Sequence, residues 1–153
     1  MNVRLIEPAI EEGSYCWLVE LGTRRVGVDA QAGWCMRIDD RVVMLDAESK
    51  LMPLGPLLGV PQAEFSAFLQ RAADALPLWA QRVRAFPKEA LLKHIFHTSH
   101  SSYWPERALD WLAADQELWP QFRDELEAFS TNKVMPQAAR QHAKRILRET
   151  ESH

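Results

Sequence analysis

The sequence predicts an α+β protein of 153 residues. Two observations predict this class. The hydrophobic period changes from two to about 3.6 after Pro61, and the predicted strands all precede the predicted helices instead of alternating with them. We therefore expect a small antiparallel β-meander within residues 1–50, followed by a bundle of about five to six helices within residues 61–150. A composition of 47% hydrophobic and 25% charged residues is ordinary for one globular domain, so residues 1–153 are expected to form a single domain.

The strands are short segments rich in β-branched and aromatic residues, separated by turn residues. Gly22-Thr23 and Asp39-Asp40 suit tight hairpin turns, and Ala30–Gly33 joins the middle pair. The first eight residues interrupt their apolar run with charges and Pro8, which is not typical of a signal peptide. The predicted strands cover residues 14–20, 25–29, 34–38 and 41–46.

The segment from Leu51 to Pro61 mixes proline and glycine with Leu, Met and Val. This apolar composition favours an ordered crossing segment packed on the core over a flexible linker. After it, apolar stripes at helical spacing predict amphipathic helices, and prolines suit the first turn of the last three. The predicted helices cover residues 65–76, 79–86, 91–95, 105–113, 120–130 and 136–149.

The two cysteines, Cys16 and Cys35, lie inside predicted strands and have no second Cys or His at metal-binding spacing. We expect buried, reduced thiols, and a disulfide or a reactive thiol is the alternative. No stretch approaches the roughly 20 uninterrupted apolar residues of a membrane span. The sequence therefore predicts a soluble, cytoplasmic protein without a membrane partner.

No catalytic motif is present. The sequence has no Gly-x-Ser-x-Gly elbow and no glycine-rich phosphate loop, and we expect neither a catalytic residue nor a cofactor. The most enzyme-like feature is the series His94, His97 and His100. On a helix His94 and His97 would be near neighbours, whereas His100 falls past the predicted helix end. A small metal-dependent hydrolase that uses this cluster is an alternative, although helix-end solvation explains the histidines without a metal.

The charges are segregated although the formal net charge is only −3. Seven acidic and two basic residues lie between Glu106 and Glu127, a local balance of −5, whereas residues 131–153 carry a balance of +3. Placed on helices, Glu106 and Asp110 share one polar face, as do Asp124 and Glu127. Such faces are either solvated helix surfaces or a surface that attracts a basic partner.

Three of the six tryptophans fall within or beside this acidic stretch. Trp111 projects between the apolar and polar faces of its predicted helix, so we expect it to be half-buried. Aromatic residues rimmed by charge are enriched at binding hot spots, and packing in the core is the alternative. The candidate partner-binding residues are Trp104, Glu106, Asp110, Trp111, Asp115, Glu117, Trp119, Asp124 and Glu127.

Two segments carry a family resemblance: Ser-Tyr-Trp-Pro-Glu-Arg-Ala-Leu-Asp-Trp-Leu at 102–112, and Met-Pro-Gln-Ala-Ala-Arg-Gln-His-Ala-Lys-Arg-Ile-Leu at 135–147. With the acidic helix between them they resemble bacterial immunity proteins that accompany polymorphic toxins, including those of contact-dependent growth inhibition. The resemblance covers about the last fifty residues. It implies a non-enzymatic protein that binds a cognate toxin, for which a basic nuclease domain is one candidate, and it transfers no individual functional residue.

Two further functions stay open. An adaptor or secretion chaperone would also bind protein, and a regulator associated with nucleic acid could use the basic faces at 82–93 and 140–148. The acidic total argues against direct binding of nucleic acid, which is itself strongly anionic.

Overall fold

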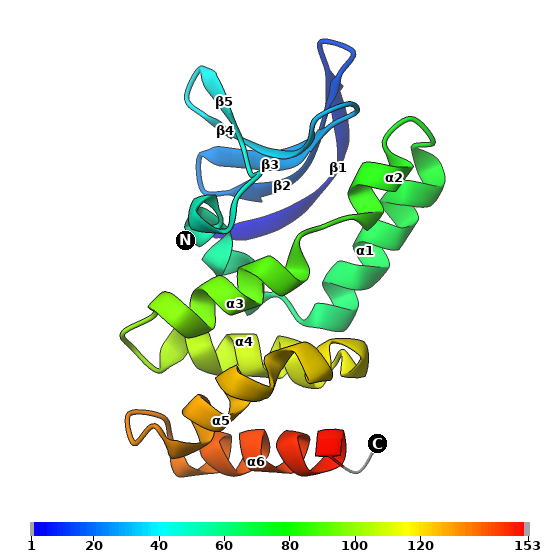
Figure 1. The fold of residues 1–153 in the computed structure, drawn as a ribbon. Helices are drawn as coiled ribbons and strands as arrows, with labels where there is room; N and C mark the ends of the chain where they lie inside the picture. The colour runs from blue at the N-terminus through cyan, green and yellow to red at the C-terminus, as the bar shows by residue number, and fades with distance from the viewer. Residues whose placement is uncertain (1, 152–153) are drawn as a thin grey trace. The chain divides into compact units, whose positions relative to one another are not determined.

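The computed structural model describes residues 2–151. It confirms the α+β class: a five-stranded antiparallel sheet is followed along the chain by six α-helices, counted over the described residues (Figure 1). The chain divides into two compact units, residues 1–87 and residues 88–153. We call them the sheet unit and the helical unit and describe each by itself.

The sheet is a meander in which every strand pairs with its neighbour in the sequence, in the order β1-β2-β3-β4-β5. Two-residue turns join β2 to β3, at Gly22-Thr23, and β4 to β5, at Asp39-Asp40, whereas three residues join each of the other pairs. Gly22 adopts the positive φ of +62° that such a tight turn requires. The strands are β1 (Val3–Glu11), β2 (Tyr15–Leu21), β3 (Arg24–Asp29), β4 (Gly33–Ile38) and β5 (Arg41–Met44).

Strand β1 is absent from the sequence-based prediction, which begins the sheet at residue 14. Its register against β2 shifts between Leu5 and Ala9, and Pro8 lies inside this irregularity. Proline lacks an N–H and is tolerated on an edge strand at such a bulge. The charges and the proline that break the apolar run are therefore compatible with an edge strand, although they conceal its pattern.

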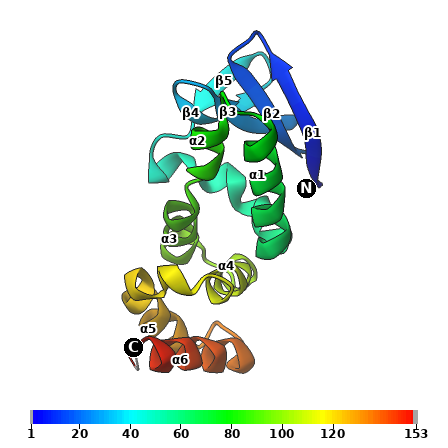
Figure 2. The same ribbon diagram turned by 90° about the vertical axis from the view of Figure 1, so that its right-hand side faces the viewer.

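Two tryptophans tie the helices of the sheet unit to its strands. The indole Nε1 of Trp34 on β4 donates to the carbonyl of Arg82 at 2.8 Å, and Nε1 of Trp79 donates to the carbonyl of Ser14 at 3.0 Å. Helix α2 (Ala80–Arg84) contacts β3 and β4, and α1 (Gln62–Ala75) packs on α2 (Figure 2). Trp34 and Trp79 thus meet the requirement that a buried indole N–H find an acceptor.

The crossing segment is ordered, as expected. It forms two 3₁₀ helices, η1 (Glu48–Lys50) and η2 (Met52–Gly59), and buries Leu54, Leu57 and Leu58. Cys16 and Cys35 are buried and unbridged, as expected. Burial raises the pKa of Cys16 to about 11, and burial together with the charge of Asp29 raises the pKa of Cys35 to about 12, so both stay protonated thiols at neutral pH.

The helical unit consists of α3 (Lys88–Thr98), α4 (Tyr103–Ala113), the 3₁₀ helix η3 (Gln116–Phe122), α5 (Arg123–Thr131) and α6 (Gln137–Glu151). Helix α5 packs on α3 and α6, and α4 packs on α3 and α6. The predicted helix start at Pro120 is wrong: Pro120 lies inside η3 and α5 begins at Arg123. Pro120 lacks a backbone N–H, and the short 3₁₀ helix accommodates it without starting an α-helix there.

The boundary between the two units follows residue 87, after two of the six helices of the described chain. The prediction separates a β-rich half at 1–50 from a helical half at 61–150, whereas α1 and α2 belong to the compact unit that contains the sheet. Burial of one sheet face against these helices gives the physical reason, since an isolated meander would leave that face in water. The single-domain organisation stays a prediction.

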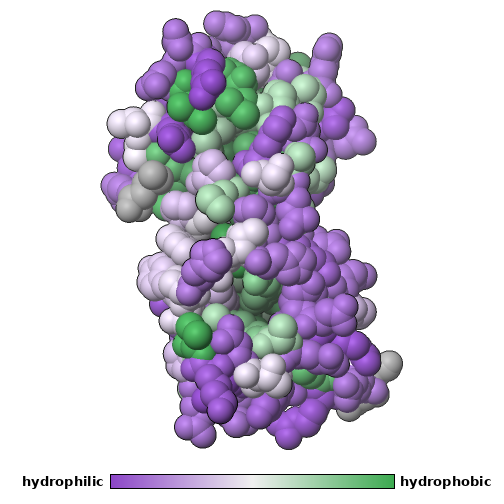
Figure 3. All heavy atoms as spheres, turned by 60° about the vertical axis from the view of Figure 1, so that its left-hand side comes forward, coloured by the Kyte–Doolittle hydropathy of each residue, from purple (hydrophilic) through white to green (hydrophobic). Residues whose placement is uncertain are grey.

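Some large hydrophobic side chains are exposed on the described part of the chain. On the face drawn in Figure 3, hydrophobic areas are interrupted by hydrophilic side chains. The large hydrophobic side chains that are exposed come from separate segments of the chain: Ile10, Met52, Leu78, Tyr103 and Val134. Within residues 2–151, no helix combines the length and the hydropathy needed to cross a bilayer.

The replacement Gly27→Ala should destabilise the sheet unit by about 3 kcal/mol, because overpacking a tight site carries a penalty of this order. A Cβ at Gly27 would lie 2.1 Å from the carbonyl oxygen of Cys16 and 2.8 Å from Cα of Trp17, both backbone atoms of β2. Urea denaturation measures the change. Gly59→Ala is the control, since its Cβ would meet nothing within 4 Å, and an equal loss in both variants would contradict the steric explanation.

Candidate functional site

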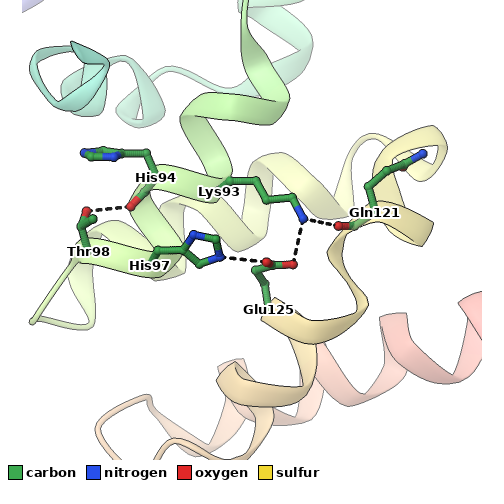
Figure 4. A network of polar contacts seen from close by, with 6 residues as sticks. All are labelled: Lys93, His94, His97, Thr98, Gln121 and Glu125. Carbon is green, nitrogen blue, oxygen red and sulfur yellow. Dashed lines mark hydrogen bonds and ion pairs between the residues drawn. The ribbon is translucent and has the colours of Figure 1, made fainter. Parts of the chain in front are cut away.

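A buried carboxylate joins α3 to α5 in the helical unit. Lys93 and His97 lie four residues apart, on one face of α3. Glu125, in the first turn of α5, accepts a hydrogen bond from each of them. Its Oε1 is 3.1 Å from Lys93 Nζ and its Oε2 is 2.8 Å from His97 Nε2 (Figure 4). Lys93 also donates to the backbone carbonyl of Gln121 in η3. One acidic side chain therefore connects two helices that are far apart in the sequence.

The electrostatics of this network favour an ionised Glu125. Its side chain is only 8% exposed, and this burial by itself raises the pKa. The hydrogen bonds from His97 and Lys93 act in the opposite direction and prevail, so the pKa of Glu125 lies below its ordinary value of 4.5. Lys93 Nζ lies 4.6 Å from the centre of the Phe122 ring, which adds a cation–π contact.

The three histidines do not form a cluster. His97 points toward Glu125, whereas His94 points to another side of α3 and is buried (Figure 4). His100 follows the end of α3 at Thr98, as expected. Among residues 2–151, no three His, Cys, Asp or Glu side chains are grouped so that they could hold a metal ion. The alternative of a metal-dependent hydrolase based on His94 and His97 therefore gains no support from their arrangement.

A pocket of about 300 Å³ opens beside this network. Its wall contains apolar groups from α3, α4, α5 and the following loop, together with the polar side chains of His97, Ser99, Asp124, Glu125 and Asn132. The apolar members are Phe96, Pro105, Ala128, Phe129 and Met135. An apolar wall with a few polar groups is typical of a binding site, and this volume lies near the lower limit of about 300 Å³ for ligand pockets.

The acidic residues that the sequence nominates fall into two groups. Asp115 is paired internally with Lys88, the two side chains being 19% and 25% exposed, and Asp110 lies 3.5 Å from Arg107. Within the described residues, the other four nominated carboxylates enter no ion pair: Glu106, Glu117, Asp124 and Glu127. Only Asp124 among the nine nominated residues lines the pocket.

The nominated tryptophans are more buried than expected. Trp111 is 2% exposed, so the expectation of a half-buried side chain is wrong. The reason is the packing of several helices around α4, which covers the side of the helix that a single-helix projection leaves open. Trp119 is also buried, and its Nε1 donates to the carbonyl of Leu112 at 2.7 Å. Trp104 is partly exposed and makes an edge contact with Tyr103, their ring centres 4.8 Å apart.

Lys93 and Glu125 are missing from the sequence-based nomination, and His97 appears there only as a member of the histidine series. Glu125 lies inside the acidic stretch, but nothing in the chain's order indicates that α3 packs on α5. The spacing of Lys93 and His97 places them on one face of a helix, a signal that could have nominated them as a pair. Only the tertiary structure shows that their partner is Glu125.

Replacing Glu125 by Gln should lower the free energy of unfolding at pH 7 by about 1–3 kcal/mol, because Lys93 loses its charged acceptor. Since the folded pKa of Glu125 is lowered, its contribution to stability is complete above 4.5 and is lost as the pH falls from 4.5 through the folded value. Denaturation curves at pH 7 and pH 3 should show the difference between wild type and variant shrinking at pH 3.

The matched control is Glu127→Gln, which changes an exposed carboxylate of the same helix that enters no ion pair among the described residues. This control should stay within about 0.5 kcal/mol of the wild type at both pH values. A Glu125→Gln variant as stable as the control at pH 7 would contradict the assigned role of the network.

No family model, curated protein or solved structure matched this chain in the comparisons. The site is accordingly defined by its own geometry: a buried carboxylate held by Lys93 and His97, an adjacent pocket, and Asp124 in that pocket, which enters no ion pair among residues 2–151.

Proposed function

We propose that the protein is a non-enzymatic binding module that recognises a basic protein partner through the acidic residues of α4, η3 and α5. The observation that carries this proposal is the division among the acidic side chains. Asp115 and Glu125 are used in internal ion pairs, whereas Glu106, Glu117, Asp124 and Glu127 have no such partner within residues 2–151.

Carboxylates without an ion pair contribute modestly to folding, at most through the helix dipole, as Glu106 and Asp124 do in the first turns of α4 and α5. They do provide a negative field that accelerates encounter with a positively charged surface. The adjacent aromatic pair adds contact area of the kind found at binding hot spots, since Tyr103 is 52% exposed and touches Trp104. Trp111 and Trp119 lie in the core, so we assign them a structural role: they pack α4 and η3 against the rest of the helical unit.

The more specific form of the proposal is a bacterial immunity protein that neutralises a cognate toxin in the cytoplasm. The resemblance of segments 102–112 and 135–147 to immunity proteins of contact-dependent growth inhibition supports it. A toxin that binds nucleic acid carries a basic surface, and an acidic inhibitor is complementary to that surface in charge. The same acidic residues oppose direct binding of nucleic acid by this chain.

The double replacement Glu106→Lys with Asp110→Lys tests the acidic surface. Association with the product of the neighbouring gene, followed by stopped-flow fluorescence, should slow about tenfold at low salt, and its dependence on salt should flatten. The dissociation rate should change less, because long-range attraction acts mainly on encounter.

Glu149→Lys is the control, an exposed carboxylate on α6 that lies outside the proposed surface. It should leave the association rate within about twofold of the wild type. Absence of any complex with the neighbouring gene product would refute the immunity assignment. A complex whose association is unaffected by the double replacement would place the interface on another surface.

A further inference from the structure

The pocket beside Glu125 has lining groups that take no part in the ion-pair network. Its lining combines an apolar wall with two adjacent carboxylates, Asp124 and Glu125. Both oxygens of Glu125 are engaged, one with Lys93 and one with His97. Asp124 is exposed and enters no ion pair within the described residues. The pocket therefore contains one carboxylate that is neutralised and one that is available to a ligand.

Two helices end at this pocket. Phe96, His97 and Ser99 line it from the last turn of α3 and the residue that follows. Ala128, Phe129 and Asn132 line it from the last turn of α5 and the residue after its end. The C-terminal end of a helix carries a partial negative charge of about half an electron, from carbonyls without an intrahelical partner. Both ends therefore add to the negative potential created by Asp124.

Two helix N-termini at the pocket, those of α4 and α5, act in the opposite sense. Pro105 lines the pocket from the first turn of α4, where the helix dipole is positive. Proline contributes no N–H there, and Glu106 in the same turn offsets the positive end. Asp124 and Glu125 offset the positive N-terminus of α5 in the same way, because both lie in its first turn. With both N-termini offset, the charge of Asp124 and the two helix C-termini favour a cation over an anion.

The shape of the pocket favours a long cationic side chain over a compact ion. Phe96 and Phe129 meet edge to face, with ring centres 6.2 Å apart, and Ala128 and Met135 extend the apolar wall. Such a wall suits a methylene stem, and a partly exposed aromatic ring suits a planar guanidinium. Guanidinium also matches a single carboxylate with two parallel hydrogen bonds, which an ammonium does not.

We propose that this pocket binds the side chain of one arginine of the protein partner, with the guanidinium on Asp124 and the stem against the apolar wall. The inference rests on the proposed function, because it names the residue type by which the basic partner would bind to the acidic surface. A volume of about 300 Å³ accommodates one side chain, and arginine is among the residues most often found as interface anchors.

The test is a titration of the full chain with N-acetyl-L-argininamide, followed by changes in backbone amide chemical shifts. The citrulline analogue has the same shape without the charge, and the lysine analogue has the charge without the planar fork. We expect saturable shifts at the pocket-lining residues with a dissociation constant of the order of 1 mM for the arginine compound. Citrulline should bind at least about tenfold more weakly, and lysine about threefold more weakly.

Two replacements on the same helix make the result specific. Asp124→Asn keeps the shape of the side chain and should weaken binding of the arginine compound about fivefold or more. Glu127→Gln removes a neighbouring carboxylate that does not line the pocket, and it should change binding by less than about twofold. Both changes are at exposed positions, so unaltered spectra in the absence of ligand will verify that the fold is retained.

Equal binding of arginine and citrulline, equal binding of arginine and lysine, shifts confined to residues outside the pocket, or equal effects of the two replacements would each overturn the arginine assignment. Such a failure would leave the proposed function standing if charge reversal at Glu106 and Asp110 still slowed association with the partner. Conversely, an arginine pocket in a protein that does not bind its neighbouring gene product would refute the immunity assignment alone.

Discussion

The helical unit depends on the burial of one carboxylate. A charge that is largely removed from water is stable only if opposite charges or donors replace the lost hydration, and Glu125 obtains these from Lys93 and His97 on α3. Because the two donors occupy successive turns of one helix, both contacts form only when the first turn of α5 lies against that face of α3. The position of the adjacent pocket, whose lining comes from the same two helices, follows from this constraint.

Three of the six tryptophans have a structural role that is separate from binding. Trp34, Trp79 and Trp119 each donate an indole N–H to a backbone carbonyl while their rings fill the core. A large apolar ring with one directional donor can both stabilise a contact and specify its geometry, which suits helices that must be held against strands or against each other. Trp104, partly exposed beside Tyr103, is the one nominated tryptophan available to a partner.

Acidic residues have two different environments in the helical unit. Asp115 and Glu125 stabilise the packing of helices, while Asp124 and Glu127 on α5 and Glu106 on α4 keep their charge uncompensated by ion pairs among residues 2–151. The contrast is sharpest between Asp124 and Glu125, which are adjacent in the sequence and both line the pocket. A helix turns by about 100° per residue, so neighbours in sequence can serve packing and recognition separately.

The sequence by itself determined the α+β class, four of the strands, the approximate positions of the helices and the segregation of charge, because these depend on local period and composition. Strand β1 was not predicted, because a register shift and Pro8 obscure its alternation of apolar and polar residues. Only the tertiary structure decided that Trp111 is buried, that Glu125 is paired whereas Asp124 is not, and that two helix ends and an apolar wall enclose a pocket. Burial and pairing depend on which helices meet, and that is a property of contacts between distant segments.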